Sequence, residues 1–272
     1  MPEYPEISHL AGQMNGALTG KTISGAEVNQ EKCLNMSVEA FQQAVSGRTI
    51  TGVTSLGKWA FMALDDDARL ALNLNMGGNV VLRQPGEPLR DKWRAALRFA
   101  DGCALSVGFW FLGSLHHIAP GQAHALTDNL GADPMAEGFS FEDFDRILGQ
   151  RKATIKSVLL RQDLICGIGN FYVQDLLFLA RLHPARPVNS LDQRERRAVY
   201  DAMRSLLADA RRKGGAWYEN GLDDQPGGFE EAELLVGYRQ GQPCPACGEP
   251  IVKIKTGSTS GFICPQCQKE RP

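Results

Sequence analysis

The chain has 272 residues, of which 43% are hydrophobic and 22% are charged, so it has enough apolar material for buried cores and a length typical of about two domains. This composition excludes a disordered chain, a collagen-like chain and a small disulfide framework. Twenty-nine basic and thirty-one acidic side chains give a formal charge of -2, which taken alone argues mildly against a polyanionic partner.

The charge is unevenly distributed along the chain. Residues 1–150 contain 11 basic and 17 acidic side chains, a balance of -6, whereas residues 151–272 contain 18 and 14, a balance of +4. The overall charge is therefore the sum of an acidic N-terminal half and a basic C-terminal half. No apolar stretch is long enough to span a bilayer, and the N-terminal MPEYPEIS has acidic residues where a signal peptide has basic ones. We expect a cytoplasmic protein with no membrane partner.

The first 118 residues have the pattern of one helix followed by short strands. Apolar residues recur at helical spacing from Pro5 to Leu18, and Gly20 supplies a stop signal. Gly, Asp and Pro then separate short apolar or alternating runs, which predicts an antiparallel sandwich or barrel. The runs are TISGAEV, RTITGVTSL, AFMALDD, LALNLN, NVVLR, AALRFA and ALSVGFWF.

Residues 119–139 have little periodicity and mark a domain boundary, and Ser140 then begins a helical region. The predicted helices lie in SFEDFDRILGQ, TIKSVLLRQ, FYVQDLLFLARL and a long segment from Ser190 to the glycines at 214 and 215. Residues 214–240 are rich in Gly and Asp, which indicates a long loop.

Four of the seven cysteines form two CxxC pairs, Cys244 with Cys247 and Cys264 with Cys267, separated by sixteen residues. This spacing predicts one structural zinc ion held by four thiolates, with two strands around a Gly/Ser turn between the pairs. A pair of redox motifs is the alternative, but no thioredoxin-like βαβ pattern accompanies them.

The segment DLICGIGN, residues 163–170, lies between two predicted helices. Gly167 and Gly169 allow close approach of a ligand to the backbone, and Asn170 is a candidate cap for the next helix, whose free N–H groups suit an anion. Arg146 to Gln162 contains five basic residues and no acid, which favours a nucleic-acid backbone as the source of that anion. A simple tight turn is the alternative.

The N-terminus is a third candidate site. Removal of Met1 would expose the secondary amine of Pro2, and an α-amino group with a pKa of about 8 is partly unprotonated at neutral pH. Glu3 is placed to transfer protons, and Glu6 lies one helical turn further on. From these residues alone, a well-formed helix start explains the pattern better.

These features together resemble the formamidopyrimidine-DNA glycosylase and endonuclease VIII family. The resemblance covers essentially the whole chain and rests on MPEYPEI, GKWAF, LNMGG, KATIKSVLL, GIGNFY, RLHPAR and the terminal cysteine pairs. It implies an α+β multidomain fold: an N-terminal helix and antiparallel β-sandwich over residues 1–130, a helix-two-turn-helix domain with a lesion loop over 131–240, and a zinc ribbon over 241–272.

The resemblance implies a bifunctional DNA glycosylase and abasic-site lyase of base excision repair, acting as a bacterial, nucleoid-associated monomer. Its partner would be double-stranded DNA with a damaged base or an abasic site, and its cofactor one structural zinc ion. By position, Pro2 would form a Schiff base at the sugar C1′ and Glu3 would transfer protons. The implied catalytic set is Pro2, Glu3, Glu6 and Lys58. The implied DNA-binding set is Lys58, Met76, Lys156, Gly167, Gly169, Asn170 and Tyr172.

Two stretches depart from the family pattern. Phe109-Trp110-Phe111-Leu112-Gly113 lacks the arginine of the usual wedge, so these residues are either an apolar wedge or buried strand. The turn of the zinc ribbon lacks an arginine and has Thr256, Ser258, Thr259 and Ser260, whose hydroxyls bring no charge to a phosphate. A lesion-sensing DNA-binding protein with weak or no catalysis is therefore the alternative, and a zinc-ribbon protein acting on RNA or protein is a third.

Overall fold

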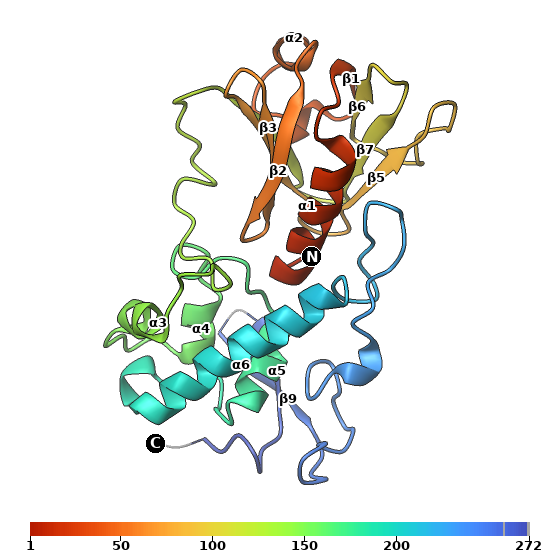
Figure 1. Ribbon diagram of the computed structural model, residues 1–272. Helices are drawn as coiled ribbons and strands as arrows, with labels where there is room; N and C mark the ends of the chain where they lie inside the picture. The colour runs from red at the N-terminus through yellow and green to blue at the C-terminus, as the bar shows by residue number, and fades with distance from the viewer. Residues whose placement is uncertain (258, 271–272) are drawn as a thin grey trace. The chain divides into compact units, whose positions relative to one another are not determined.

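The computed structural model describes residues 1–257 and 259–270 of the chain (Figure 1). These residues form two compact units. The first, here called the sandwich unit, contains residues 1–128 and 211–229, and the second, the helical unit, contains residues 129–210 and 230–270. The chain therefore leaves the sandwich unit and returns to it for nineteen residues before it enters the helical unit again.

The sandwich unit begins with α1, Tyr4–Leu18. Pro5 stands in its first turn, where a missing N–H costs nothing, and Glu3 and Glu6 form a capping box around its first turn. Thr19 is the C-cap, and Gly20 follows with a positive φ of 85°. The predicted helix and its stop are confirmed, and the helix buries Ile7, Leu10, Ala11, Met14 and Leu18 in the core of the unit.

Two separate antiparallel sheets of four strands form the sandwich, with orders β1-β6-β7-β5 and β2-β3-β4-β8. Each of the predicted strands is present, and the two-sheet arrangement decides for a sandwich over a barrel. The helix α1 packs against β2. The strands are β1 (Ile23–Val28), β2 (Ile50–Leu56), β3 (Trp59–Leu64), β4 (Arg69–Asn73), β5 (Asn79–Arg83), β6 (Ala95–Phe99), β7 (Ala104–Gly108) and β8 (Ser114–Ile118).

The region predicted to contain only strands also contains helical turns, η1 (Glu31–Cys33) and α2 (Val38–Val45). The signal for α2 is present in the sequence. The Ser37 hydroxyl accepts a hydrogen bond from the Ala40 N–H, as an N-cap does, and Phe41 and Val45 are buried one turn apart. Because α2 is only two turns long, its period is easily overlooked between strands.

The helical unit contains α3 (Phe141–Leu148), α4 (Ile155–Leu159), α5 (Tyr172–Leu179), η2 (Val188–Ser190) and α6 (Gln193–Arg212), of which the last two residues belong to the sandwich unit. Ser140 begins α3 with a capping box to Asp143, as predicted. The predicted serine start of α6 is wrong. Asp192 accepts from the Glu195 N–H at 2.7 Å and Glu195 accepts from the Asp192 N–H at 3.1 Å, so the capping box lies two residues beyond Ser190.

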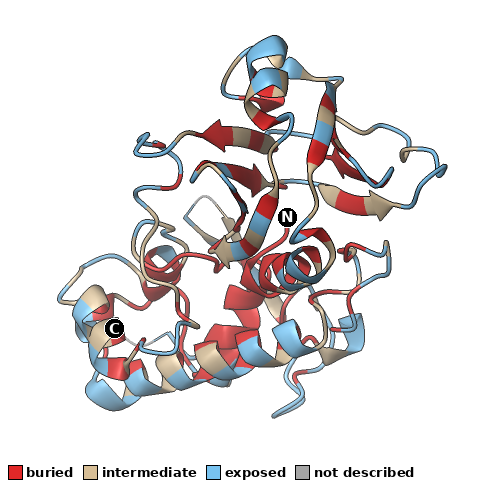
Figure 2. Ribbon diagram, turned by 45° about the horizontal axis from the view of Figure 1, so that its top comes forward, coloured by how far each residue is buried: buried red, intermediate tan, exposed pale blue. Residues whose placement is uncertain are grey.

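The helix α6, the longest helix in Figure 2, is buried along one face and exposed along much of the other. Val199, Met203 and Leu207 are fully buried, whereas much of the opposite face is exposed. Among the described residues, no helix combines the length and the apolar character that crossing a bilayer requires.

Candidate functional site and metal centre

Two acidic side chains at the start of α1 are almost completely buried, Glu3 at 3% and Glu6 at 7% exposure. One oxygen of Glu6 accepts from the Glu3 N–H at 2.7 Å and the other from the Ala216 N–H at 2.9 Å. The Glu3 side chain is held in turn by the backbone N–H of Glu6. Pro2 is buried beside them. The capping of α1 therefore fixes both carboxylates next to the N-terminus.

The hydrogen bond between Glu6 and Ala216 depends on Gly215. This glycine has a φ of 89°, and a Cβ atom on it would lie 2.5 Å from the Glu6 Cγ. Only glycine lets residues 211–229 pass so close to α1. The approach ties a segment more than two hundred residues away in sequence to the N-terminus.

A third buried acid, Glu219, lies at the same place and was not predicted from the sequence. It is 8% exposed, and one of its oxygens lies 3.2 Å from the amino nitrogen of Met1. Burial raises the pKa of Glu219 to about 7, with the amino group opposing that rise and Glu6 and Glu3 adding to it. A single acid within a loop has no periodicity or spacing that could have revealed it.

Lys58 occupies the turn between β2 and β3, and its carbonyl accepts from the Asn73 side chain at 3.0 Å. Burial lowers the pKa of the Lys58 ammonium, and the charges of Glu3 and Glu6 oppose that shift. Lys58 thus lies in the field of both carboxylates. The structure brings together the four residues of the predicted catalytic set.

Met76 belongs to an exposed apolar tip formed by two loops of the sandwich unit. Its side chain is 54% exposed, and those of Trp110, Phe111 and Leu112 are 80%, 61% and 68% exposed. The Trp110 N–H donates to the Met76 carbonyl at 3.2 Å, which joins the loops. Phe109 is buried at 4%, and its carbonyl accepts from Arg94 at 3.1 Å. The stretch therefore divides into one buried anchor and three exposed residues.

In the helical unit, Lys156 is only 2% exposed and faces the hairpin of the zinc ribbon. Its ammonium donates to the Thr256 hydroxyl at 2.8 Å and to the Ser260 carbonyl at 2.6 Å. Burial lowers the pKa of Lys156 to about 8. In this conformation the side chain supports the hairpin, and its DNA-binding role stays a prediction.

Gly167, Gly169 and Asn170 form a compact turn before α5, and Gly167 has a φ of 98°. The Gly167 N–H donates to the Gln162 side chain at 2.9 Å. The predicted capping of α5 by Asn170 is wrong: the N-cap is Phe171, and the Asn170 carbonyl and side chain both accept from the Gln174 amide at 3.0 Å.

Tyr172 is 2% exposed. Its ring packs edge to face against the ring of Phe171, with 4.8 Å between the two ring centroids. The phosphate contacts of this turn and the DNA-binding role of Tyr172 stay predictions.

Two of the hydroxyl groups expected to face a phosphate, those of Thr256 and Thr259, are engaged within the ribbon. The Thr256 hydroxyl donates to the Thr259 carbonyl at 3.1 Å, and the Thr259 hydroxyl donates to the Thr256 carbonyl at 3.2 Å. Ser260 lies on β10 and Ser258 lies outside the described residues. The hairpin of β9 (Val252–Thr256) and β10 (Thr259–Ile263) confirms the two strands predicted between the cysteine pairs.

The four cysteines of the ribbon gather at one point. Their sulfur atoms all lie within 4.8 Å of one another, with separations of 3.8 Å between Cys244 and Cys267, 3.4 Å between Cys247 and Cys264, and 3.6 Å between Cys247 and Cys267. A tetrahedron with Zn–S bonds of about 2.3 Å has edges of about 3.8 Å, so the donor set fits zinc. None of the four is in a disulfide.

The chain matches three domains of one group of proteins. Residues 1–108 match the formamidopyrimidine-DNA glycosylase N-terminal domain, residues 130–219 its H2TH domain, and residues 241–269 the zinc finger found in FPG and IleRS. The chain belongs to the formamidopyrimidine-DNA glycosylase family. The resemblance inferred from the sequence is thereby confirmed, and so is the predicted fold class.

Relatives in this family are similar over their whole length. A formamidopyrimidine-DNA glycosylase of Heliobacterium modesticaldum is 33% identical over 99% of this chain and 100% of its own, and one of Chloroflexus aurantiacus is 32% identical over 98% of both. The Lactococcus lactis Fpg in complex with a DNA containing N7-benzyl-Fapy-dG superposes with a TM-score of 0.90 at 28% identity, covering 99% and 100% of the two chains. Its complex with an abasic-site DNA gives 0.89, covering 98% and 100%.

Membership in the formamidopyrimidine-DNA glycosylase family assigns the chain to the DNA glycosylases, which begin base excision repair. The family zinc finger and the clustered sulfur atoms together support one structural zinc ion held by Cys244, Cys247, Cys264 and Cys267. Backbone N–H groups of Ala246 and Cys267 donate to two of these sulfurs at 3.4 Å, which stabilises thiolates. A closed set of four ligands holds shape and leaves no coordination position for catalysis.

Proposed function

We propose that the protein removes a damaged base and then cleaves the strand at the resulting abasic site, with Pro2 as the nucleophile. One observation carries this proposal: the N-terminal amino group, Glu3, Glu6, Glu219 and Lys58 lie together in the sandwich unit. An amine among carboxylates and beside a cation has what imine chemistry on a sugar phosphate requires: a nucleophile, proton carriers and charge for the phosphate.

The chemistry begins with removal of Met1, which leaves the secondary amine of Pro2. Its attack on the sugar C1′ forms an iminium ion, an electron sink that allows β-elimination and then δ-elimination of the flanking phosphates. Glu3 moves protons during ring opening and elimination. Glu6 has backbone N–H partners on both oxygens and serves to position α1 against residues 215 and 216.

The partner is double-stranded DNA with a damaged base or an abasic site, bound by a monomer on the bacterial nucleoid. Relatives have been solved with such DNA, the Lactococcus lactis Fpg on an abasic site among them. A base that leaves the helix costs a few kcal/mol in lost stacking, and an inserted apolar side chain offsets part of that cost. Met76 and the exposed apolar tip supply such side chains, and Lys58 binds the phosphate beside the lesion.

Borohydride trapping tests this proposal. The protein with Met1 removed is mixed with a duplex containing one abasic site, and reduction of the imine is expected to give a covalent protein–DNA adduct. A protein whose N-terminal amine is blocked should give none. Strand cleavage without a trappable adduct, or tight binding with neither, would refute the proposed lyase, and the second result would support a lesion-sensing protein. A panel of duplexes with single lesions then identifies the base that is removed.

Replacing Lys58 by alanine is expected to weaken binding to abasic DNA and to reduce the slope of log K against log salt by about one, because one phosphate contact and its released counterion are lost. Fluorescence anisotropy at several salt concentrations measures both quantities. Lys32→Ala removes an exposed lysine of the same unit and should leave the slope unchanged. An unaltered slope in Lys58→Ala would contradict the phosphate contact.

Replacing Trp110 by alanine is expected to weaken binding to abasic DNA about 10- to 100-fold, the range of one lost base-stacking contact. The exposed tip has no charged side chain, so the loss should be the same whichever base lies opposite the lesion. Leu126→Ala removes another exposed apolar side chain of the sandwich unit and serves as the control. A loss confined to one opposite base would show that the tip reads that base.

A further inference from the structure

Glu219 is one of three buried acids beside the N-terminus, and its carboxylate is directed at the amino group. Both oxygens of Glu6 accept from backbone N–H groups, and the Glu3 side chain takes part in the capping box of α1. Glu219 forms an ion pair with the Met1 nitrogen at 3.2 Å. The catalytic set derived from the sequence does not contain this residue.

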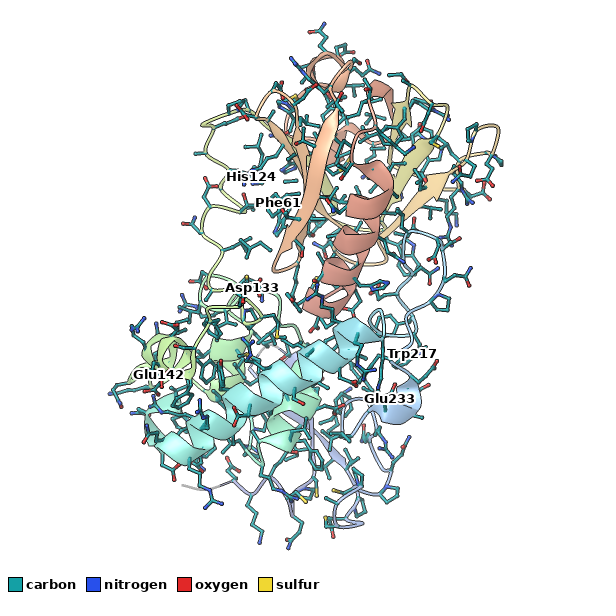
Figure 3. All side chains as sticks on the ribbon, viewed as in Figure 1. Phe61, His124, Asp133, Glu142, Trp217 and Glu233 are labelled. Atoms are coloured by element: carbon teal, nitrogen blue, oxygen red, sulfur yellow. The ribbon has the colours of Figure 1, made fainter. Side chains whose placement is uncertain are left out.

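The backbone around Glu219 is fixed at both of its polar groups. Its N–H donates to the Ala216 carbonyl at 3.0 Å, and its carbonyl accepts from the Gly227 N–H at 2.9 Å. Three residues on, Leu222 is buried in the core of the sandwich unit, and its N–H donates to the Gln13 side chain at 2.8 Å. The segment is therefore held against α1, and it brings the backbone of Glu219 to a defined position beside the N-terminus. Figure 3 marks Trp217 on the same segment.

We propose that Glu219 is a further catalytic residue, which pairs with the N-terminal ammonium and takes up its proton before the amine attacks the sugar. This inference rests on the proposed function of Pro2. Removal of Met1 shifts the terminal amine by one residue, about 3.8 Å along the chain, a distance that the flexible side chain of a glutamate can follow.

The reacting partner in this step is an abasic sugar in its aldehyde form. The Pro2 ammonium gives one proton to Glu219, and the free lone pair forms the N–C1′ bond while the carbonyl π electrons move to oxygen. That oxygen receives the proton from Glu219 and the second proton of the nitrogen, and it leaves as water. The ammonium and the aldehyde thus yield an iminium ion and one water, and Glu219 is again a carboxylate.

The surrounding charges define the pH dependence of this step. The amino group and Glu219 lie together with Glu3 and Glu6 on one side, and Lys58 faces Glu3 and Glu6 from the turn between β2 and β3. Because the ammonium gives its proton to the Glu219 carboxylate, the paired form is the active one, and protonation of Glu219 sets the acidic limit of the rate. In Glu219→Gln this acceptor is lost, while the other three groups stay in place.

The test is the pH dependence of the single-turnover rate of borohydride trapping on abasic DNA, with Met1 removed. In Glu219→Gln the maximal rate is expected to fall at least about tenfold, because the proton acceptor is lost. The acidic limb of the profile is expected to move to higher pH, because the amine must then lose its proton to solvent before it attacks the sugar. Glu219→Asp keeps the charge and should keep the limb near its wild-type position.

Asp223→Asn is the matched control, since it neutralises an exposed acid four residues away in the same segment. A slower Glu219→Gln enzyme whose acidic limb is unmoved would assign Glu219 a structural role and overturn the inference. An unchanged rate and profile would overturn it as well. Absence of an adduct from the wild-type protein would refute the proposed function itself, so the two failures are distinguishable.

Discussion

Pro2→Gly is expected to reduce the rate of adduct formation on abasic DNA by about 10²-fold or more, with the fold unchanged. A secondary amine gives an iminium ion that carries a fixed positive charge, whereas the imine of a primary amine is neutral unless it is protonated. Glycine also removes the pyrrolidine ring that fixes the substituents of the nitrogen, so the lone pair of the amine loses its defined orientation beside the buried carboxylates. Single-turnover trapping measures the loss.

The matched control for this variant is Pro5→Gly, which removes the other proline at the start of α1. This change should lower the melting temperature because it weakens the first turn of the helix, yet the adduct should persist. Equal adduct formation in Pro2→Gly and wild-type protein would show that another amine is the nucleophile.

Cys247→Ser, or removal of zinc by a chelator, is expected to unfold the zinc ribbon and to weaken binding to abasic DNA at least about tenfold. A structural zinc site contributes roughly 10 to 16 kcal/mol, which is comparable to the whole stability of a domain. The apolar cluster beneath the ribbon is small and includes Phe178, Val236, Ile251 and Phe262. It is too small to hold the hairpin without the metal.

Metal analysis measures the loss of zinc, near-ultraviolet circular dichroism the unfolding of the ribbon, and fluorescence anisotropy the weaker binding to DNA. Gln266→Ala changes an exposed residue between two of the ligand cysteines and should keep one zinc per chain and wild-type affinity. A zinc-free protein that binds abasic DNA as tightly as the zinc-loaded one would contradict a role of the ribbon in DNA binding.

The sequence was sufficient to predict the elements whose signals are local. The helical period and the Gly20 stop predicted α1, the short apolar or alternating runs predicted β1 to β7 but not β8, and the spacing of the cysteines predicted the metal centre. Ser140 and Asp143 predicted the start of α3, because a capping box is formed within four consecutive residues. The two-turn helix α2 was missed although Ser37 signals its start, because a short period has little statistical weight.

The part of the site that was missed depends on contacts between distant residues. Glu219 lies more than two hundred residues from the N-terminus, and contacts such as those of Gly215 with Glu6 and of Leu222 with Gln13 bring its segment there. The resemblance implies that Lys156 and Asn170 bind DNA, and that prediction stands untested; in this structure their polar groups also bond within the helical unit. Residue type indicates what a side chain is able to bind, whereas tertiary packing decides what it contacts.

The return of residues 211–229 to the sandwich unit has a consequence for synthesis on the ribosome. A nascent chain that ends before residue 211 has Pro2, Glu3 and Lys58, but it lacks the Ala216 N–H that holds Glu6, the Glu219 carboxylate and the Leu222 side chain of the core. The N-terminus is therefore surrounded by this full set of groups only when most of the protein has been made. With the N-terminal amine as the nucleophile that we propose, its site is completed just before the segments that bind the zinc are synthesised.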